Sequence, residues 1–421
     1  MTERALLVTV EFHSMPRQTP LEDFAKELEA LASSAGLQVI QNLKARQKAP
    51  NPALLVGEGK AQEIKALVAG EKIDVVVFGM NLSATQQRNI EALVQAKTID
   101  RTQLILDIFA QRARSNEGKL QVELAQLNYL LPRLTGKGIA LSRLGGGVGT
   151  RGPGEQKLEV DRRRVRERLA RLSRELSKLQ ERRSQSIRKK KEKELPLVSL
   201  VGYTNSGKST LFNALTRASV TVRDQLFSTL DTTTRLLILP GNQRVFLADT
   251  VGFVRALPHT LVEAFKATLE EARQADLLLH VVDSSRPDAG LLVEAVNCVL
   301  DELGIRHEKV ILVLNKADLV SSGKTSALVN YAGGESAFVS AKTGEALQEL
   351  CLKIADFLSG GRDTAEIFVP KERLGLAHWL YEEGQVLERR NTALGAHFMV
   401  RLTDKAKRIF VSRLGRADSL T

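Results

Sequence analysis

An eight-residue segment that begins at residue 202 has the residue types and spacing needed to hold phosphate groups. It matches G-x-x-x-x-G-K-S, follows a strand-like run at 197–201 and precedes a helix-like run at 210–215, which is the context that a P-loop requires. The glycines would let backbone amides wrap the phosphates, and the helix N-terminus would add a favourable dipole. The predicted phosphate-binding residues are Gly202, Tyr203, Thr204, Asn205, Ser206, Gly207, Lys208 and Ser209. Of these, Lys208 would contact the β- and γ-phosphates, and the Ser209 hydroxyl would bind Mg²⁺.

A second motif follows the apolar run 245–248 and starts 40 residues beyond Ser209. Read alone, its D-T-x-G pattern is only a turn, but at this distance from a P-loop it predicts a switch segment. Asp249 is expected to hold Mg²⁺ through water, and the Gly252 amide to sense the γ-phosphate. The four residues are Asp249, Thr250, Val251 and Gly252. We therefore predict Lys208 and Gly252 as the catalytic groups.

A third motif, at the end of the strand-like run 310–314, indicates which base is bound. An aspartate carboxylate only accepts hydrogen bonds, so it pairs with the two adjacent donors of guanine and would be left unpaired against adenine. Asp318 is the predicted carboxylate, and Lys316 would lie along the plane of the base. A last segment, after the strand-like run 337–339, would contact the guanine oxygen through its backbone. The residues of the two segments are Asn315, Lys316, Ala317, Asp318, Ser340, Ala341 and Lys342.

Two positions near the phosphates depart from the Ras-like GTPase pattern. Phe253 stands directly after the switch glycine, where those GTPases place a glutamine that orients water. A phenyl ring cannot orient water, so we expect slow intrinsic hydrolysis that a partner accelerates. Asn205 resembles the asparagine of potassium-assisted GTPases, which makes K⁺ a candidate second cation. The alternative is that Asn205 only shapes the loop.

The elements before residue 113 predict a small α/β domain with a parallel sheet. Strand-like and helix-like stretches alternate, and Thr19 followed by Pro20 predicts an N-cap and first helical residue. The expected strands are 5–12, 39–42, 53–56, 75–78 and 98–100, and the expected helices are 20–36, 58–69, 84–95 and 101–113. The Val56-Gly-Glu-Gly-Lys60 turn resembles part of a second nucleotide site, but Ala61 replaces the required Ser or Thr, which favours an ordinary turn.

Two further helices carry the same apolar spacing and predict an antiparallel hairpin. The leucines of the first arm and the valine and leucines of the second recur at intervals of four and three residues. They are Leu120, Leu124, Leu127, Leu131 and Leu134, and Val165, Leu169, Leu172, Leu176 and Leu179. The connection, residues 136–155, contains eight glycines. It is either a flexible connector or, as its length and charge favour, a tip whose amides and basic side chains approach phosphates.

The positive charge of the chain is concentrated in this hairpin. Residues 133–194 hold 20 Lys or Arg against 8 Asp or Glu, which equals the whole net charge of +12. Such a block suggests a polyanionic partner, although a charged helix face can also be merely solvated. The side chains that we predict to contact RNA are Lys137, Arg143, Arg151, Arg162, Arg163, Arg164, Arg188, Lys189 and Lys190.

These observations divide the 421 residues into four parts. We expect an N-terminal α/β domain at 1–113, a basic helical hairpin at 114–195, a nucleotide-binding α/β domain at 196–360 and a small α+β domain at 361–421. For the last of these, the pattern predicts strands at 366–369, 397–402 and 408–411 and a helix at 372–382. Apolar runs are strand-sized, so none spans a membrane. Cys298 and Cys351 have no metal-ligand spacing and are expected to be reduced thiols in the cytosol.

The motifs together resemble the HflX family of ribosome-associated GTPases, within the Obg–HflX-like group. The resemblance rests on the DRTQLILDIF run at 100–109, on the glycine-rich LGGGVGTRGPGE run at 144–155 and on the FSTLDTTTR run at 227–235. Alignment with Obg-type switches makes Thr229 the second Mg²⁺ hydroxyl, with Thr232 or Thr233 as alternatives. The resemblance adds a first-switch group of predicted GTP contacts: Phe227, Ser228, Thr229, Leu230 and Asp231.

Membership of this family would imply a cytoplasmic, partly ribosome-bound GTPase that is stimulated by ribosomes and splits them under stress. The basic hairpin would then meet ribosomal RNA of the large subunit, with GTP or GDP as the small ligand and the chain acting as a monomer. Two other functions remain open from the sequence. One is an RNA-processing or ribosome-assembly GTPase, against which there is no metal cluster or second cofactor fingerprint. The other is a membrane-surface signalling GTPase, against which the basic arm carries Leu and Val rather than inserting aromatics.

Overall fold

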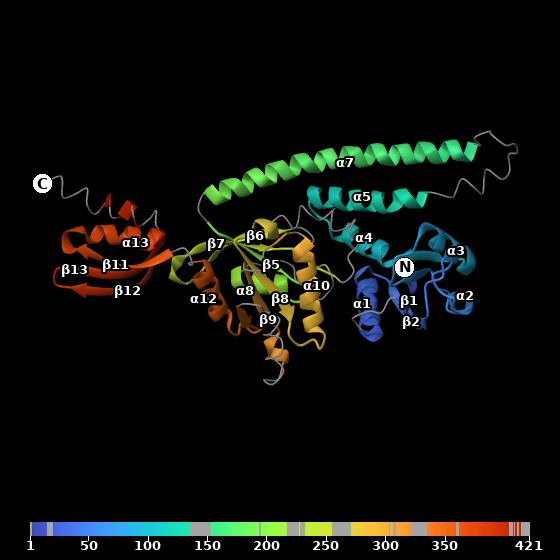
Figure 1. The fold of residues 1–421 in the computed structure, drawn as a ribbon, viewed down its shortest axis with the longest axis horizontal. Coiled ribbons are helices and arrows are strands. Elements are labelled where there is room, and N and C mark those ends of the chain that lie inside the picture. Colours follow the sequence, from blue (N-terminus) through green and yellow to red (C-terminus); the bar gives the residue numbers. More distant parts are fainter. Residues whose placement is uncertain are drawn as a thin grey trace.

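The structure is a computed structural model, which describes the chain in segments. The described residues are 2–14, 20–134, 153–192, 195–216, 227, 232–254, 271–302, 304–305, 309–320, 335–358, 362–403, 407, 409–410 and 412–413, and in the helix after residue 152 the side chains are described for 159–179 and 181. Figure 1 shows three sheet-containing parts following one another along the longest axis, with two helices lying side by side above them. This mixed α/β architecture confirms the predicted fold class.

The N-terminal part is a four-stranded parallel sheet with helices on both faces. Its strand order is β2-β1-β3-β4. Its elements are β1 (Arg4–Phe12), α1 (Leu21–Ser34), β2 (Gln38–Gln47), α2 (Glu58–Gly70), β3 (Val75–Phe78), α3 (Ala84–Val94), β4 (Lys97–Asp100) and α4 (Arg101–Arg112). Alternate residues of β1 pack on opposite faces, Leu7 toward α1 and α4 and Leu6 toward α2 and α3. The strands are therefore buried on both faces, as parallel strands are.

Two local expectations in this part were wrong. Residues 53–56 form a turn rather than a strand, because the Asn51 side chain accepts hydrogen bonds from the amides of Ala53 (2.8 Å) and Leu54 (3.1 Å), and Leu55 has a left-handed φ of 62°. Helix α1 begins at Leu21 with Pro20 as its N-cap, one residue later than expected. Thr19 lies outside the described residues.

The two arms of the hairpin are α5 (Asn116–Leu130), which ends in the 3₁₀ turn η1 (Leu131–Leu134), and α7 (Pro153–Glu192). They run antiparallel in Figure 1 and are in contact. Leu172 and Leu176 of α7 are buried, whereas the other residues of the two predicted stripes are half-buried. Arg168 of α7 binds both carboxylate oxygens of Glu123 at 2.7 and 2.8 Å. No described helix is both long and apolar enough to cross a membrane.

The central part contains a six-stranded sheet of order β10-β9-β8-β5-β7-β6, in which only β6 pairs antiparallel. Its elements are β5 (Leu197–Val201), α8 (Lys208–Thr216), β6 (Thr233–Ile238), η2 (Pro240–Asn242), β7 (Arg244–Asp249), β8 (Leu277–Asp283), α10 (Ala289–Glu302), β9 (Val310–Asn315), η4 (Ala317–Leu319), β10 (Ser336–Phe338) and α12 (Leu347–Leu358). Helices α8 and α12 cover one face of the sheet. The other face carries α10 and shares one hydrophobic core with α1, α4 and α5.

The C-terminal part is a three-stranded antiparallel sheet of order β11-β13-β12. Its elements are β11 (Arg362–Pro370), η5 (Lys371–Leu376), α13 (Ala377–Glu383), β12 (Gln385–Thr392) and β13 (Gly395–Thr403). Strand β12 was not expected, and the strand expected at 408–411 was wrong, because Ile409 and Phe410 are helical. Phe410 instead packs into the core of this part and stacks on Trp379.

Candidate functional site

In the loop between β5 and α8, the two glycines adopt backbone conformations that other residues rarely adopt. Gly202 and Gly207 have φ angles of 146° and 92°. A Cβ atom at Gly202 would lie 2.2 Å from the Val281 carbonyl oxygen, and one at Gly207 would lie 2.2 Å from Asn315 Nδ2. Both positions therefore require glycine for close packing as well as for conformation.

Lys208 is buried at the centre of this loop. Its Nζ donates hydrogen bonds to the carbonyl oxygens of Gly202 (3.1 Å) and Tyr203 (2.7 Å). Burial lowers the pKa of Lys208 to about 8, and the negative charge of Asp249 opposes that shift in part. The loop therefore holds a poorly solvated amine beside two backbone carbonyl groups, and this amine is suited to bind an anionic ligand.

Ser209 and Asp249 lie together beside the lysine, although 40 residues separate them. The Ser209 hydroxyl donates to Asp249 Oδ2 at 2.7 Å, and both residues are buried. The next hydroxyl, that of Thr250, donates to the Leu200 carbonyl oxygen at 2.6 Å and so ties the end of β7 to β5. A hydroxyl and a carboxylate oxygen at one buried point are donors that fit Mg²⁺.

The switch segment after Asp249 is paired with the loop by backbone hydrogen bonds. The Thr204 amide donates to the Phe253 carbonyl oxygen at 2.7 Å, and the Phe253 amide donates to the Gly202 carbonyl oxygen at 3.1 Å. A Cβ atom at Gly252 would lie 2.8 Å from Thr204 Cγ2, so the segment approaches closely because this residue is glycine. The Phe253 side chain is buried in the core shared with the N-terminal part, as is Val251.

The loops after β9 and β10 meet the phosphate loop through one amide side chain. Asn315 Nδ2 donates to the Ser206 carbonyl oxygen at 2.9 Å, and Asn315 Oδ1 accepts from the Ala341 amide at 3.0 Å. Asp318 is exposed and accepts from the Ser340 hydroxyl at 2.6 Å, while the Ala317 amide donates to Val339. The three loops therefore form one continuous surface at the carboxyl edge of the sheet.

Lys316 and Lys342 differ in how they are held. Lys316 has a left-handed φ of 62°, and its Nζ lies 2.7 Å from Asp283 Oδ2. Lys342 is exposed. Sequence reasoning did not single out Asp283, yet it ends the buried strand β8 and therefore lies at the same sheet edge as the other motifs. Its place at the end of a strand-like run was the feature of the sequence that could have identified Asp283.

The expected site residues outside these loops are only partly described. Ser228, Thr229, Leu230 and Asp231 lie outside the described residues, as do Lys137, Arg143 and Arg151. Phe227 is buried, and its ring meets the Phe109 ring of α4 edge-on, with centroids 4.5 Å apart. On α7, Arg163 and Arg164 are exposed and Arg162 is half-buried, whereas the side chains of Arg188, Lys189 and Lys190 are not described. The Phe227 ring therefore packs against the N-terminal part of the chain.

The fold and the four loops at one sheet edge define a P-loop GTPase. Matches to four family models cover most of the chain. They are GTP-binding GTPase N-terminal (22–110), GTP-binding GTPase Middle Region (112–190), 50S ribosome-binding GTPase (197–316) and HflX C-terminal domain (327–420). Two relatives, both named GTPase HflX, are each 46% identical to this chain. The Caldanaerobacter subterraneus protein aligns over 92% of this chain and 88% of its own length, and the Escherichia coli protein over 85% and 83%.

The chain belongs to the HflX family of GTPases, and it hydrolyses GTP. The resemblance drawn from the motifs is thereby confirmed. Among solved structures, the chain is similar to a GTP-binding protein from Sulfolobus solfataricus in complex with GDP. That similarity covers 85% of this chain and 98% of the other, with 27% identity and a TM-score of 0.45.

Proposed function

We propose that this chain is a GTPase switch that binds the large ribosomal subunit and splits ribosomes. The observation that carries the nucleotide part is the Asn315 side chain, which joins the Ser206 carbonyl oxygen to the Ala341 amide. The predicted phosphate-binding and base-binding loops are thereby connected. In this surface Lys208 binds the β- and γ-phosphates, Asp318 accepts from the two guanine donors, and the Gly252 amide meets the γ-phosphate.

Magnesium fits the buried oxygen pair formed by Ser209 and Asp249. Bound there, Mg²⁺ would neutralise charge on the β- and γ-phosphates. The second hydroxyl ligand is assigned to Thr229. Thr233 is the strongest alternative, because it lies opposite Asp249 in the β6–β7 ladder. Replacing each threonine with alanine and measuring Mg²⁺-dependent GTP binding distinguishes them, because only the ligand's loss weakens GTP binding while sparing GDP binding.

Potassium is a separate prediction at Asn205. The residue is exposed and has a left-handed φ of 61°, which favours the reading that it shapes the loop. GTP hydrolysis measured in KCl and in NaCl at equal ionic strength tests the cation directly. Equal rates would leave Asn205 with the structural role alone.

The ribosomal part of the proposal rests on the basic hairpin and on the family. The matched model of the central domain is described as a 50S ribosome-binding GTPase. The whole surplus of positive charge lies in residues 133–194. Arg163 and Arg164 on α7 have side chains that are 72% and 75% exposed, and their ion pairs within the helix are long, at 3.7 and 3.9 Å. Such loosely held cations are free to exchange their partners for RNA phosphates.

Co-sedimentation and subunit dissociation test the proposal together. We expect the GTP-bound chain to pellet with large subunits, to hydrolyse GTP faster when they are present, and to convert intact ribosomes into subunits. Phe253 gives a reason for the stimulation, because its buried ring offers no group to orient water. Pelleting with anionic liposomes but not with ribosomes would favour a membrane-surface GTPase. Ribosome binding without dissociation would favour an assembly or RNA-processing role in the cytoplasm.

A further inference from the structure

The second residue of the P-loop, Tyr203, has its side chain in contact with the N-terminal part of the chain. Its ring belongs to the hydrophobic core that α1, α4 and α5 share with the central part, and the residue is 5% exposed. Its hydroxyl donates to Glu27 Oε1 of α1 at 2.6 Å. The side chain of Tyr203 is therefore anchored outside the G domain, while its backbone remains part of the phosphate loop.

The acceptor of this hydrogen bond is one member of a buried ion pair. Arg101 Nη2 lies 2.6 Å from Glu27 Oε1, and the guanidinium carbon lies 4.9 Å from the centre of the Phe24 ring. The side chains of Arg101 and Glu27 are only 3% and 7% exposed. Removing one partner of such a pair leaves a buried charge uncompensated, so the two side chains stay together. Tyr203 therefore donates to a charged oxygen whose place is fixed.

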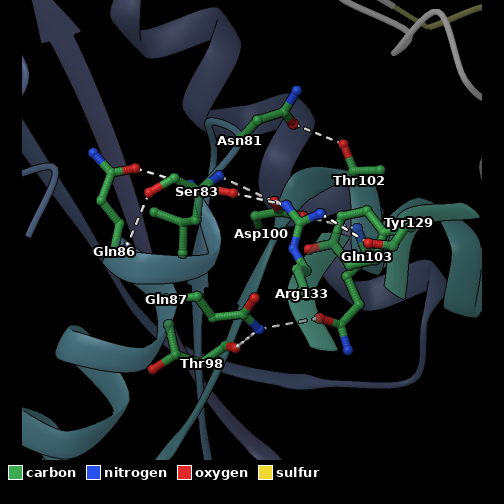
Figure 2. Close-up of polar contacts among 11 residues, drawn as sticks. Asn81, Ser83, Gln86, Gln87, Thr98, Asp100, Thr102, Gln103, Tyr129 and Arg133 are labelled. Atoms are coloured by element: carbon green, nitrogen blue, oxygen red, sulfur yellow. Dashed lines mark hydrogen bonds and ion pairs between the residues drawn. The ribbon is translucent and has the colours of Figure 1, made fainter. Parts of the chain in front are cut away.

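The backbone around Arg101, at the turn from β4 to α4, is held by side chains on both sides, as Figure 2 shows. Asp100 is the N-cap of α4, and its Oδ2 accepts from the Leu82 amide at 3.0 Å. On the other side of Arg101, the Thr102 hydroxyl donates to Asn81 Oδ1 at 2.7 Å. These contacts tie the turn to the loop after β3, so the arginine that holds Glu27 projects from a well-fixed point of the N-terminal sheet.

The backbone of Tyr203 links this network to the functional groups of the phosphate loop. Its carbonyl oxygen accepts from Lys208 Nζ at 2.7 Å. Its two neighbours in the chain bond to one residue of the switch segment, because the Thr204 amide donates to the Phe253 carbonyl oxygen and the Phe253 amide donates to Gly202. One residue therefore connects the N-terminal part, the lysine predicted to bind phosphates and the switch segment.

An anchor from outside matters for this loop because the loop is rich in conformational freedom. Gly202 and Gly207 have positive φ angles, and glycine loses more backbone entropy on ordering than any other residue. A loop that is already ordered when the nucleotide arrives loses less entropy on binding. Ordering one residue of backbone corresponds to a factor of about ten in affinity.

We propose that Glu27 and Arg101 are positioning residues for the nucleotide site, which act through the Tyr203 hydroxyl to hold the P-loop in the conformation that binds phosphates. The inference rests on the proposed phosphate contact of Lys208. The N-terminal part thereby contributes to nucleotide affinity through the loop and not through contact with the nucleotide. Because the free loop is what the anchor orders, its loss affects binding more than hydrolysis.

The first test uses the full chain with Tyr203→Phe, which keeps the ring and removes only the hydroxyl. The KM for GTP and the Kd for GDP should each rise by about tenfold, the factor for ordering about one residue of backbone. The intrinsic kcat should stay within about twofold, because bound phosphates order the loop in both proteins. Hydrogen exchange of the Thr204 and Phe253 amides reports the order of the loop and should accelerate in the nucleotide-free variant only.

A second variant removes the ion pair itself, by Glu27→Leu together with Arg101→Met. Replacing a buried ion pair with apolar side chains of similar volume is often neutral or stabilising, so this change takes away the charged acceptor of Tyr203 and keeps the fold. The KM for GTP should rise as it does in Tyr203→Phe. Adding Tyr203→Phe to this variant should change KM by less than about twofold, because the hydroxyl and the ion pair act in series.

Tyr381→Phe is the matched control, because it removes a hydroxyl from a tyrosine that is 42% exposed in the C-terminal part, and its KM should equal that of wild type. An unchanged KM and GDP affinity in Tyr203→Phe would overturn the proposal even if the variant were less stable, because a purely structural hydrogen bond changes the free energy of unfolding alone. Additive effects of Tyr203→Phe and the ion-pair variant would also overturn it. Unweakened nucleotide binding by Lys208→Ala would instead overturn the proposed phosphate contact.

Discussion

The hydroxyl of Tyr203, the second residue of the P-loop, donates a hydrogen bond of 2.6 Å to Glu27 of helix α1. The same oxygen of Glu27 accepts from Arg101 Nη2, also at 2.6 Å, and all three side chains are buried. Arg101 in turn lies over the Phe24 ring. The phosphate loop is therefore attached to the N-terminal domain by a charged hydrogen-bond network as well as by the shared hydrophobic core.

Replacing Tyr203 with phenylalanine removes this attachment without changing the ring. The buried Glu27 carboxylate then loses the hydrogen bond from Tyr203 and keeps the one from Arg101. Hydrogen bonds to charged groups contribute about 1.5–3 kcal/mol each. We expect the free energy of unfolding in urea to fall by that amount. Tyr381→Phe serves as the control, because Tyr381 is 42% exposed and its replacement should be nearly neutral. Equal stabilities for the two variants would show that the Tyr203 hydroxyl contributes nothing.

The positions of the four motif-bearing loops at the sheet edge could be predicted, because each loop is a short motif at the end of a strand. Contacts between distant segments could not be predicted in this way. Glu27 and Tyr203 are 176 residues apart, and neither position has a local pattern that marks a partner. Phe227 was expected at the nucleotide because it begins the switch run, and the packing of its ring on Phe109 was not expected. Which aromatic ring fills an interdomain core depends on packing that a single sequence does not encode locally.

Local errors arose where apolar periodicity was weak. Strand β12 is an edge strand, and its Glu-Arg-Arg run at 388–390 is exposed, so it lacks the apolar alternation on which strand prediction depends. It is stabilised by pairing with β13 rather than by burial of its own side chains. Conversely, residues 408–411 contain three adjacent apolar residues, which fit a strand or a helix equally well. The strand prediction at 53–56 was wrong because hydrogen bonds to the Asn51 side chain stabilise a turn there.

Nucleotide affinity should decrease at high pH because of Lys208. Burial lowers its pKa to about 8, so the free protein holds the charged amine below that pH and loses it progressively above. Phosphate groups bind the charged form, so the affinity for Mg·GTP should be flat up to about pH 8 and then fall by up to about tenfold per pH unit. Calorimetric titration between pH 7 and 9.5 measures this, and proton uptake on binding should appear over the same range.

Lys208 should also affect the free energy of unfolding of the nucleotide-free protein. Its contribution to that free energy should rise with pH, whereas the nucleotide affinity should fall. Between pH 8 and the ordinary lysine pKa of 10.5, the unfolded chain binds the proton that folded Lys208 has lost, so this group makes folding more favourable as pH rises. Lys208→Met removes the titration and should flatten that contribution. A wild-type affinity for Mg·GTP that stays constant to pH 9.5 would contradict the lowered pKa.

We expect the guanine contact to depend on Ser340 as well as on Asp318. Because the Ser340 hydroxyl donates to Asp318 Oδ1 at 2.6 Å, it fixes the orientation of an otherwise exposed carboxylate. Ser340→Ala should weaken the binding of GTP by about 1 kcal/mol, the net value of one such hydrogen bond, without strengthening the binding of ATP.

Asp318→Asn should weaken the binding of GTP more than Ser340→Ala does. It should also let xanthosine triphosphate compete with GTP, because xanthine replaces the exocyclic donor with an acceptor. Competition binding with the three nucleotides checks both variants, and wild-type protein that binds ATP as tightly as GTP would refute the base assignment.

Ribosome binding should depend steeply on salt because the positive charge of the chain is concentrated in one arm. Each phosphate contact made by Lys or Arg releases counterions, so the affinity should fall by orders of magnitude between about 50 and 200 mM salt if 6–10 contacts form. Replacing Arg162, Arg163 and Arg164 together with glutamine should reduce the slope of log affinity against log salt by up to about two to three units. The intrinsic GTPase should not change, because none of these residues is among the predicted nucleotide-binding residues. Pelleting across a salt series measures the slope, and Arg389→Gln with Arg390→Gln in the C-terminal sheet provides a control outside the arm. An unchanged slope in the α7 variant would mean that its basic face is only solvated.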